Sequence, residues 1–123
     1  MFSRTNTQSR ILLVDDDANQ ITLLNNVLKN IGQVFFEQKG CSAVEQAIKT
    51  RADIILLDIE MPDLNGHQVL AQLKEHPKTC DIPIIFITSH DSAEDQLRCL
   101  EEGAVDFIAK PLQPNIVADR VNT

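Results

Sequence analysis

The stretch DIILLD, residues 53–58, decides the fold of this 123-residue chain. It is a short apolar run between two aspartates, rich in isoleucine and leucine and too short for a stable helix. Such a run is typical of a strand that is buried on both faces of a parallel sheet. Asp58 then lies where the strand leaves the sheet, and segment 59–66 that follows contains the proline, asparagine and glycine typical of a loop.

Three other apolar runs also end in side chains that can carry chemistry. Residues 11–14 lead to Asp15, Asp16 and Asp17, residues 84–87 lead to Thr88 and Ser89, and residues 105–109 lead to Lys110 and Pro111. In an open parallel sheet, ligands bind outside the carboxyl ends of the strands. The sequence therefore predicts one site that gathers an acidic cluster, a further aspartate, a hydroxyl and a lysine.

Strand-like and helix-like segments alternate five times along the chain. The expected strands are residues 10–14, 33–37, 53–58, 82–88 and 104–108, and the expected helices are residues 18–30, 42–49, 66–74, 92–102 and 114–121. Gly32 is expected to stop the first helix, and Asn65 and Ser92 can cap the third and fourth. This alternation predicts an α/β fold, a single doubly wound domain with a five-stranded parallel sheet and helices on both faces.

Composition narrows the classes of function. The net charge of −7 argues against a nucleic-acid-binding surface, because neutralising phosphates requires an excess of lysine and arginine. Cys41, Cys80 and Cys99 form no CxxC pair, which favours free thiols in a reduced compartment. No apolar run approaches the roughly 18 residues of a membrane span, and residues 1–9 lack the apolar core of a signal peptide. We therefore expect a cytoplasmic protein without membrane contact.

The domain is expected to cover residues 10–123, after a flexible lead-in over residues 1–9. The last expected helix is short, and the chain stops at Asn122 and Thr123 without a C-terminal cap signal. We expect this helix to be cut from a longer protein.

The acidic cluster predicts a magnesium site. The carboxylates of Asp15, Asp16 and Asp58 would repel one another unless a cation neutralised them. Mg²⁺ suits the site, because it binds through one or two carboxylates and leaves room for a phosphoryl oxygen. Lys110 would face Asp58 as a compact positive charge, and Thr88 could donate its hydroxyl to a phosphoryl oxygen. Asp58 is then a nucleophile that can take up a phosphoryl group as an acyl phosphate.

The chain resembles the response regulator receiver domains of two-component signalling. The motifs LLVDDD at 12–17, LDIEMPDLNG at 57–66, TS at 88–89 and KP at 110–111 occur in the family's order and span nearly the whole chain. The resemblance implies a flavodoxin-like fold with strand order 2-1-3-4-5. It also implies that Asp58 accepts phosphate from a histidine of a sensor kinase or phosphotransfer protein. Such a domain is a signalling switch rather than an enzyme, since it catalyses only its own phosphoryl transfer and dephosphorylation.

The resemblance assigns roles within the metal site. Asp16 and Asp58 would ligate Mg²⁺ directly, and Asp15 would act mainly through water. Glu60 would offer its backbone carbonyl. Glu60 and His90 also match places where the family tunes phosphoryl lifetime, with exposed loop polarity as the alternative reading.

The resemblance further implies a conformational switch. Thr88 and Phe107 match the hydroxyl and aromatic positions of the switch, and Lys110 matches the lysine before a cis bond to Pro111. Phe107 replaces the frequent tyrosine, so this ring cannot hydrogen-bond. Phosphorylation would then alter the face made by the fourth helix, fifth strand and fifth helix, and with it partner docking or homodimer formation.

The output is expected to be a further domain or partner protein. Residues 110–121 resemble receivers that precede domains synthesising or degrading cyclic di-GMP.

Two other functions fit parts of the pattern. In a haloacid-dehalogenase-like phosphatase, Asp15 would be the nucleophile and Asp17 the acid/base, with Thr88 and Lys110 as later motifs. Against this, the usual acidic pair near the last strand is missing and Asp58 is left unexplained. In a flavodoxin-like cofactor binder, the aspartates after the first strand would repel the phosphate, and neither GxGxxG nor GxxxxGK occurs.

Overall fold

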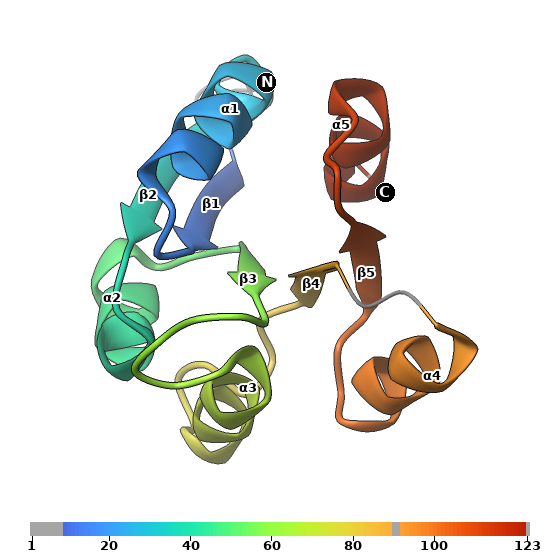
Figure 1. Cartoon of the computed structure of the whole chain (residues 1–123). Helices are drawn as coiled ribbons and strands as arrows, with labels where there is room; N and C mark the ends of the chain where they lie inside the picture. The colour runs from blue at the N-terminus through green and yellow to red at the C-terminus, as the bar shows by residue number, and fades with distance from the viewer. Residues whose placement is uncertain (1–8, 90–91, 123) are drawn as a thin grey trace.

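Parallel strands form a single sheet in the order β2-β1-β3-β4-β5 in the computed structural model of the chain, which describes residues 9–89 and 92–122 (Figure 1). The strands are β1 (Ser9–Val14), β2 (Gly32–Glu37), β3 (Ile54–Asp58), β4 (Ile84–Thr88) and β5 (Asp106–Ala109). The α-helices are α1 (Ala18–Leu28), α2 (Ala43–Thr50), α3 (Gly66–Glu75), α4 (Ala93–Glu101) and α5 (Pro114–Asn122), and a 3₁₀ turn, η2 (Gly40–Ser42), precedes α2. The predicted α/β fold and strand order are confirmed.

Helices cover both faces of the sheet. Helices α1 and α5 lie on one face, and α2, α3 and α4 lie on the other (Figure 1). Strand β3 contributes to both layers: Ile55 and Leu57 pack towards α2 and α3, while Leu56 packs towards α1 and α5. All three side chains are buried, as expected for the central strand of a doubly wound sheet.

Side chains cap three of the helices. Asn65 and Gln68 form a reciprocal capping box at the start of α3, which confirms Asn65 as a cap. Ser92 accepts a hydrogen bond from the backbone N–H of Asp95 at the start of α4, also as predicted. Asp17 caps α1 by accepting from the backbone N–H of Asn19.

The prediction that Gly32 stops the first helix is wrong. Helix α1 ends at Leu28, and Gly32 is the first residue of β2. A Cβ atom at this position would lie 2.4 Å from the backbone oxygen of Ser9. The glycine therefore permits the close approach of β2 to β1.

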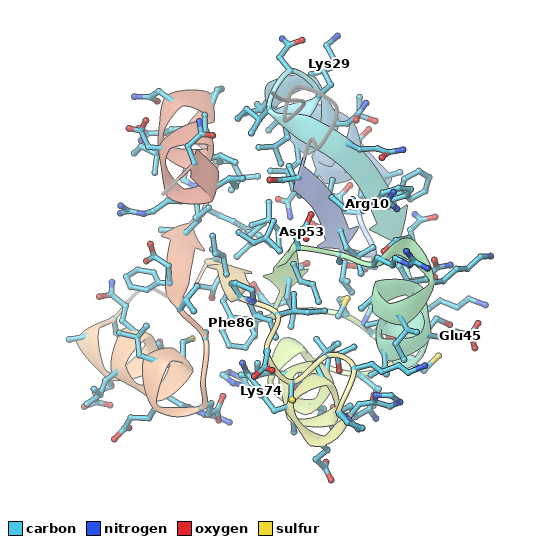
Figure 2. All side chains as sticks on the ribbon, turned by 180° about the vertical axis from the view of Figure 1, so that it is seen from behind. Arg10, Lys29, Glu45, Asp53, Lys74 and Phe86 are labelled. Carbon is cyan, nitrogen blue, oxygen red and sulfur yellow. The ribbon has the colours of Figure 1, made fainter. Side chains whose placement is uncertain are left out.

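All five strands differ from the predicted bounds by one or two residues. Strands β1 and β2 each begin one residue earlier, at Ser9 and Gly32, and the other three begin later. Strand β3 begins at Ile54, and the carboxylate of Asp53, just before it, accepts from the Arg10 backbone N–H at 2.8 Å (Figure 2). Strand β4 begins at Ile84, immediately after Pro83, which has no N–H to donate to the ladder. Strand β5 is shifted towards the carboxyl end, covering 106–109 rather than 104–108.

Within the described residues, none of the helices combines the length and the apolar character needed to cross a membrane.

Candidate functional site

The carboxyl ends of the central strands bring the predicted site residues together. Strand register places Asp58 beside Ile87 and Thr88 beside Ala109, so the ends of β3, β4 and β5 lie side by side. The backbone N–H of Lys110 donates to the Thr88 carbonyl at 2.8 Å, which continues this pairing past the end of β5. Asp58, Thr88 and Lys110 therefore occupy neighbouring strand ends because the sheet is parallel.

Asp58 is a buried carboxylate held from two sides. Its side chain is 2% exposed, and its Oδ1 accepts a hydrogen bond from Lys110 Nζ at 3.1 Å. The same oxygen accepts from the backbone N–H of Glu60 at 3.3 Å. Burial of a carboxylate is costly unless it is paired, and Lys110 supplies the pairing charge.

Asp15 and Asp16 lie next to Asp58. One carboxylate oxygen from each of the three residues lies within 4.8 Å of the others. Asp15 is buried, and its two oxygens accept from the Asp17 backbone N–H at 2.9 Å and from the Gln20 side-chain amide. Asp16, by contrast, is exposed. Asp15 is thus fixed by protein donors, while Asp16 faces outwards.

The charges of this cluster are incompletely balanced. Burial raises the pKa of Asp15. Burial, followed by the negative charge of Asp15, raises the pKa of Asp58 to about 6, although Lys110 acts in the opposite direction. Three hard oxygen donors at this spacing, with more negative charge than one lysine neutralises, fit a divalent cation such as Mg²⁺.

Thr88 and Phe107 lie on adjacent strands near this cluster. Thr88 is 1% exposed at the end of β4. Phe107, on β5, is partly buried against the core beneath α3 and α4. The Lys110–Pro111 peptide bond is cis. His90, also expected at the site, lies outside the described residues.

Glu60 lies on the loop between β3 and α3. Its Oε1 accepts a hydrogen bond from Ser89 Oγ at 2.6 Å, which joins this loop to the end of β4.

Sequence reasoning missed Gln20 and gave Ser89 no role of its own, yet both side chains shape the site. Gln20 orients Asp15, and Ser89 contacts Glu60. Gln20 carries no motif signal, because a polar residue on a helix is ordinary. Ser89 follows Thr88 in the TS motif, yet its partner depends on how two loops pack.

Asp17, the acid/base of the phosphatase alternative, has a different role in the structure. Its Oδ1 accepts from the Asn19 backbone N–H at 2.9 Å, so it caps α1. The cap directs this carboxylate to the helix start, which weighs against a phosphatase built on Asp15.

Comparison with known proteins identifies the family of the chain. A sequence profile of the response regulator receiver domain matches residues 11–122. Protein PilH of Pseudomonas aeruginosa is 34% identical over 115 residues, which cover 93% of this chain and 95% of PilH.

Two longer relatives match through only part of their length. A probable cyclic di-GMP phosphodiesterase of Vibrio cholerae is 35% identical over 95% of this chain, and response regulator PleD of Caulobacter vibrioides is 37% identical over 94%. In each case the chain covers 26% of the relative, about a quarter of its length.

Solved structures share the fold. A putative response regulator from Chloroflexus aurantiacus aligns with a TM-score of 0.87 at 29% identity, covering 94% of this chain and 96% of that one. The chemotaxis protein CheY4 of Vibrio cholerae has the same fold, with a TM-score of 0.87 at 24% identity over 94% of this chain and 98% of its own. With the profile match over 11–122 and the full-length match to PilH, the chain belongs to the response regulator receiver domain family.

Proposed function

We propose that this domain is a phosphorylation-dependent switch in which Asp58 is the phosphoacceptor. The observation that carries the proposal is the setting of Asp58, a buried carboxylate between Lys110 and the Asp15–Asp16 pair. In the reaction, a carboxylate oxygen of Asp58 attacks phosphorus of a phosphohistidine on a sensor kinase or phosphotransfer protein. The P–N bond breaks, the imidazole leaves with the electron pair, and Asp58 becomes an acyl phosphate.

Mg²⁺ would neutralise charge on the phosphoryl oxygens when it is bound. We assign Asp16 and Asp58 as its direct ligands, Asp15 as a ligand through water, and Glu60 as a backbone carbonyl ligand. Asp15 supports this division, because both of its oxygens already accept from protein donors. The exposed carboxylate of Asp16 is the more accessible one.

Lys110 and Thr88 would act on the phosphoryl group itself. Lys110 Nζ, now 3.1 Å from Asp58 Oδ1, would pair with a phosphoryl oxygen once that carboxylate is phosphorylated. Thr88 would donate its hydroxyl to another oxygen. Glu60 and His90 remain the candidates for tuning the lifetime of the acyl phosphate.

The output would be controlled through the face formed by α4, β5 and α5. Movement of Thr88 towards the phosphoryl group would allow Phe107 to turn inward, changing what this face binds. We propose partner docking or homodimer formation as the response, in the cytoplasm, where a sensor kinase would supply phosphate. The chain covers only part of the probable cyclic di-GMP phosphodiesterase of Vibrio cholerae, and this similarity favours an output linked to cyclic di-GMP.

Phosphorylation with a small phosphodonor tests the proposal directly. Incubation with acetyl phosphate and Mg²⁺ should add one phosphoryl group, detected by intact mass, and the Asp58→Asn protein should add none. Asp81→Asn is the matched control, because Asp81 is an exposed aspartate before the start of β4, at the opposite end of this strand from Thr88, and its change should leave labelling unchanged. Labelling at Asp15 or Asp17 in the intact protein would instead support the phosphatase alternative.

A further inference from the structure

Helix α4 is weakly anchored to the domain by apolar contacts. Cys99 is its one buried residue, whereas α3 buries four. Its large apolar side chains point outwards, with Leu97 58% and Leu100 45% exposed. Because so little apolar surface holds α4, a few polar contacts can decide where it lies.

One group of polar side chains ties the end of α4 to α3. His67, in the first turn of α3, donates from Nδ1 to Oε1 of Glu102, the residue that caps α4. Nδ1 is the donor because an ionised carboxylate can only accept. Arg98 Nε donates to the other Glu102 oxygen at 3.1 Å. We call these three residues, His67, Arg98 and Glu102, the α4 tether.

The core of the sheet fixes the position of His67. Its ring lies 5.3 Å from the ring of Phe86 on β4, at an interplanar angle of 55°. Phe86 is fully buried and points from β4 towards α3 (Figure 2). The His67 side chain is only 17% exposed, so it presents its Nδ1 to Glu102 from a held position.

A groove separates α4 from the β3–α3 loop, and two residues of the α4 tether, His67 and Arg98, line it. It has a volume of about 370 Å³ and lies between the β3–α3 loop and α4. Thr88 lines it together with Glu60 and His67 on one side and Asp95 and Arg98 on the other. The tether therefore crosses the same groove that contains the proposed switch residue, and α4 has room to move within it.

We propose that His67 is a positioning residue for the switch: its hydrogen bond to Glu102 holds α4 in the position seen here, in which Lys110 bonds directly to Asp58. The proposal rests on the function proposed above. If phosphorylation moves α4 away from this position, the α4 tether opposes phosphorylation. By linkage, releasing the tether must then strengthen binding at Asp58 by the same factor.

The test compares the affinity of wild type, His67→Phe and His67→Asn for beryllofluoride in the presence of Mg²⁺. Binding is measured by titration, from the shifts of the backbone amide NMR signals of α4. His67→Phe keeps an aromatic ring against Phe86 but removes the donor. His67→Asn keeps a donor amide close to the place of Nδ1. We expect His67→Phe to bind beryllofluoride about 3- to 10-fold more tightly than wild type, the net effect of one ordinary hydrogen bond, because the Glu102 side chain is partly exposed. His67→Asn should bind as wild type does.

Glu102→Ala provides a second route to the same state, from the exposed end of the tether. It should reproduce the tighter binding, and combining it with His67→Phe should add little, because both changes remove one interaction. A purely structural role of His67 would lower thermal stability without changing beryllofluoride affinity. Unchanged or weaker binding in His67→Phe, or equal effects of His67→Phe and His67→Asn, would overturn the proposal. If wild type itself binds no beryllofluoride, the proposed function fails instead.

Discussion

The carboxylate of Asp58 is paired with Lys110, yet its burial disfavours the charged form. Its pKa in the folded protein, about 6, lies above the value of 3.8 expected for an unfolded chain. Its contribution to stability is therefore fully present below pH 3.8 and is lost as pH rises through about 6. At neutral pH without metal, the folded state carries a carboxylate that it would hold more easily as the acid.

This imbalance gives a prediction for Asp58→Asn without metal. In EDTA at pH 7, the variant should be more stable than wild type by about 1–2 kcal/mol, since it removes a charge whose pKa is raised. The difference should shrink towards pH 4, where Asp58 is increasingly protonated in the folded state. Urea unfolding at both pH values measures it. If the difference in stability does not depend on pH, titration of Asp58 is not its cause. The control variant Asp81→Asn should be as stable as wild type at both pH values.

The strand-end residues could be predicted from the sequence, whereas their supporting partners could not. Asp58, Thr88 and Lys110 each follow an apolar run, and parallel strands bring such positions to one edge. Gln20 and His67 act on residues that other elements position. Such contacts depend on helix placement, which local patterns do not encode.

At the scale of elements, Asp63 links two loops that the sequence keeps far apart. Its two carboxylate oxygens accept from the backbone N–H groups of Cys41 at 3.0 Å and Gly40 at 3.2 Å, at the start of η2. The hydrogen bond from Cys41 is the main cause that lowers the pKa of Asp63 to about 2. The β3–α3 loop and the start of α2 are thereby joined beside the site.

We expect Asp63→Ala to destabilise the fold modestly, because it leaves two backbone N–H groups without this acceptor. Since the folded-state pKa is depressed, the stabilising effect of Asp63 is present above pH 3.8 and is lost as pH falls through about 2. At pH 7 the melting temperature of Asp63→Ala should therefore be lower than that of wild type. At low pH the melting temperatures of the two proteins should converge. A matched exposed change, Asp81→Ala, should leave the melting temperature unchanged.

Element boundaries were less predictable than element types. Gly32 was expected to end a helix, and it instead allows two strands to meet. Glycine is favoured both at the end of a helix and where two strands approach closely. Which of the two applies to Gly32 depends on β1, a neighbouring strand that is remote in sequence. Pro83 sets the start of β4 for a local reason, its missing N–H, which the sequence does contain.

At the scale of the whole molecule, the sheet connects the site to a distant face. Thr88 ends β4 beside the acidic cluster, and Phe107 lies on the neighbouring strand β5, against which α4 packs. A change at Thr88 can therefore reach α4 and β5 through adjoining strands and one groove. The doubly wound topology itself was predictable, because alternating strands and helices with right-handed crossovers allow few arrangements.

Thr88→Ala tests this connection. We expect the variant to accept phosphate at Asp58, because neither the nucleophile nor Lys110 is changed, but to transmit poorly. Phosphorylation stoichiometry by intact mass should approach that of wild type, while sedimentation should show a smaller change in association state. A variant that labels fully and changes its association as wild type does would exclude Thr88 as the relay.

The small buried surface of α4 has a consequence for how the domain opens. Regions held by few apolar contacts unfold locally at a lower free energy than the core. Backbone amides of α4 should therefore exchange with deuterated solvent well before those of β3, whose Ile55, Leu56 and Leu57 are 0–1% exposed. Amide exchange followed by mass spectrometry should show two kinetic classes, with residues 93–101 in the faster one. The domain would then visit states in which α4 is detached while the sheet remains intact, so a partner could capture this helix without unfolding the protein.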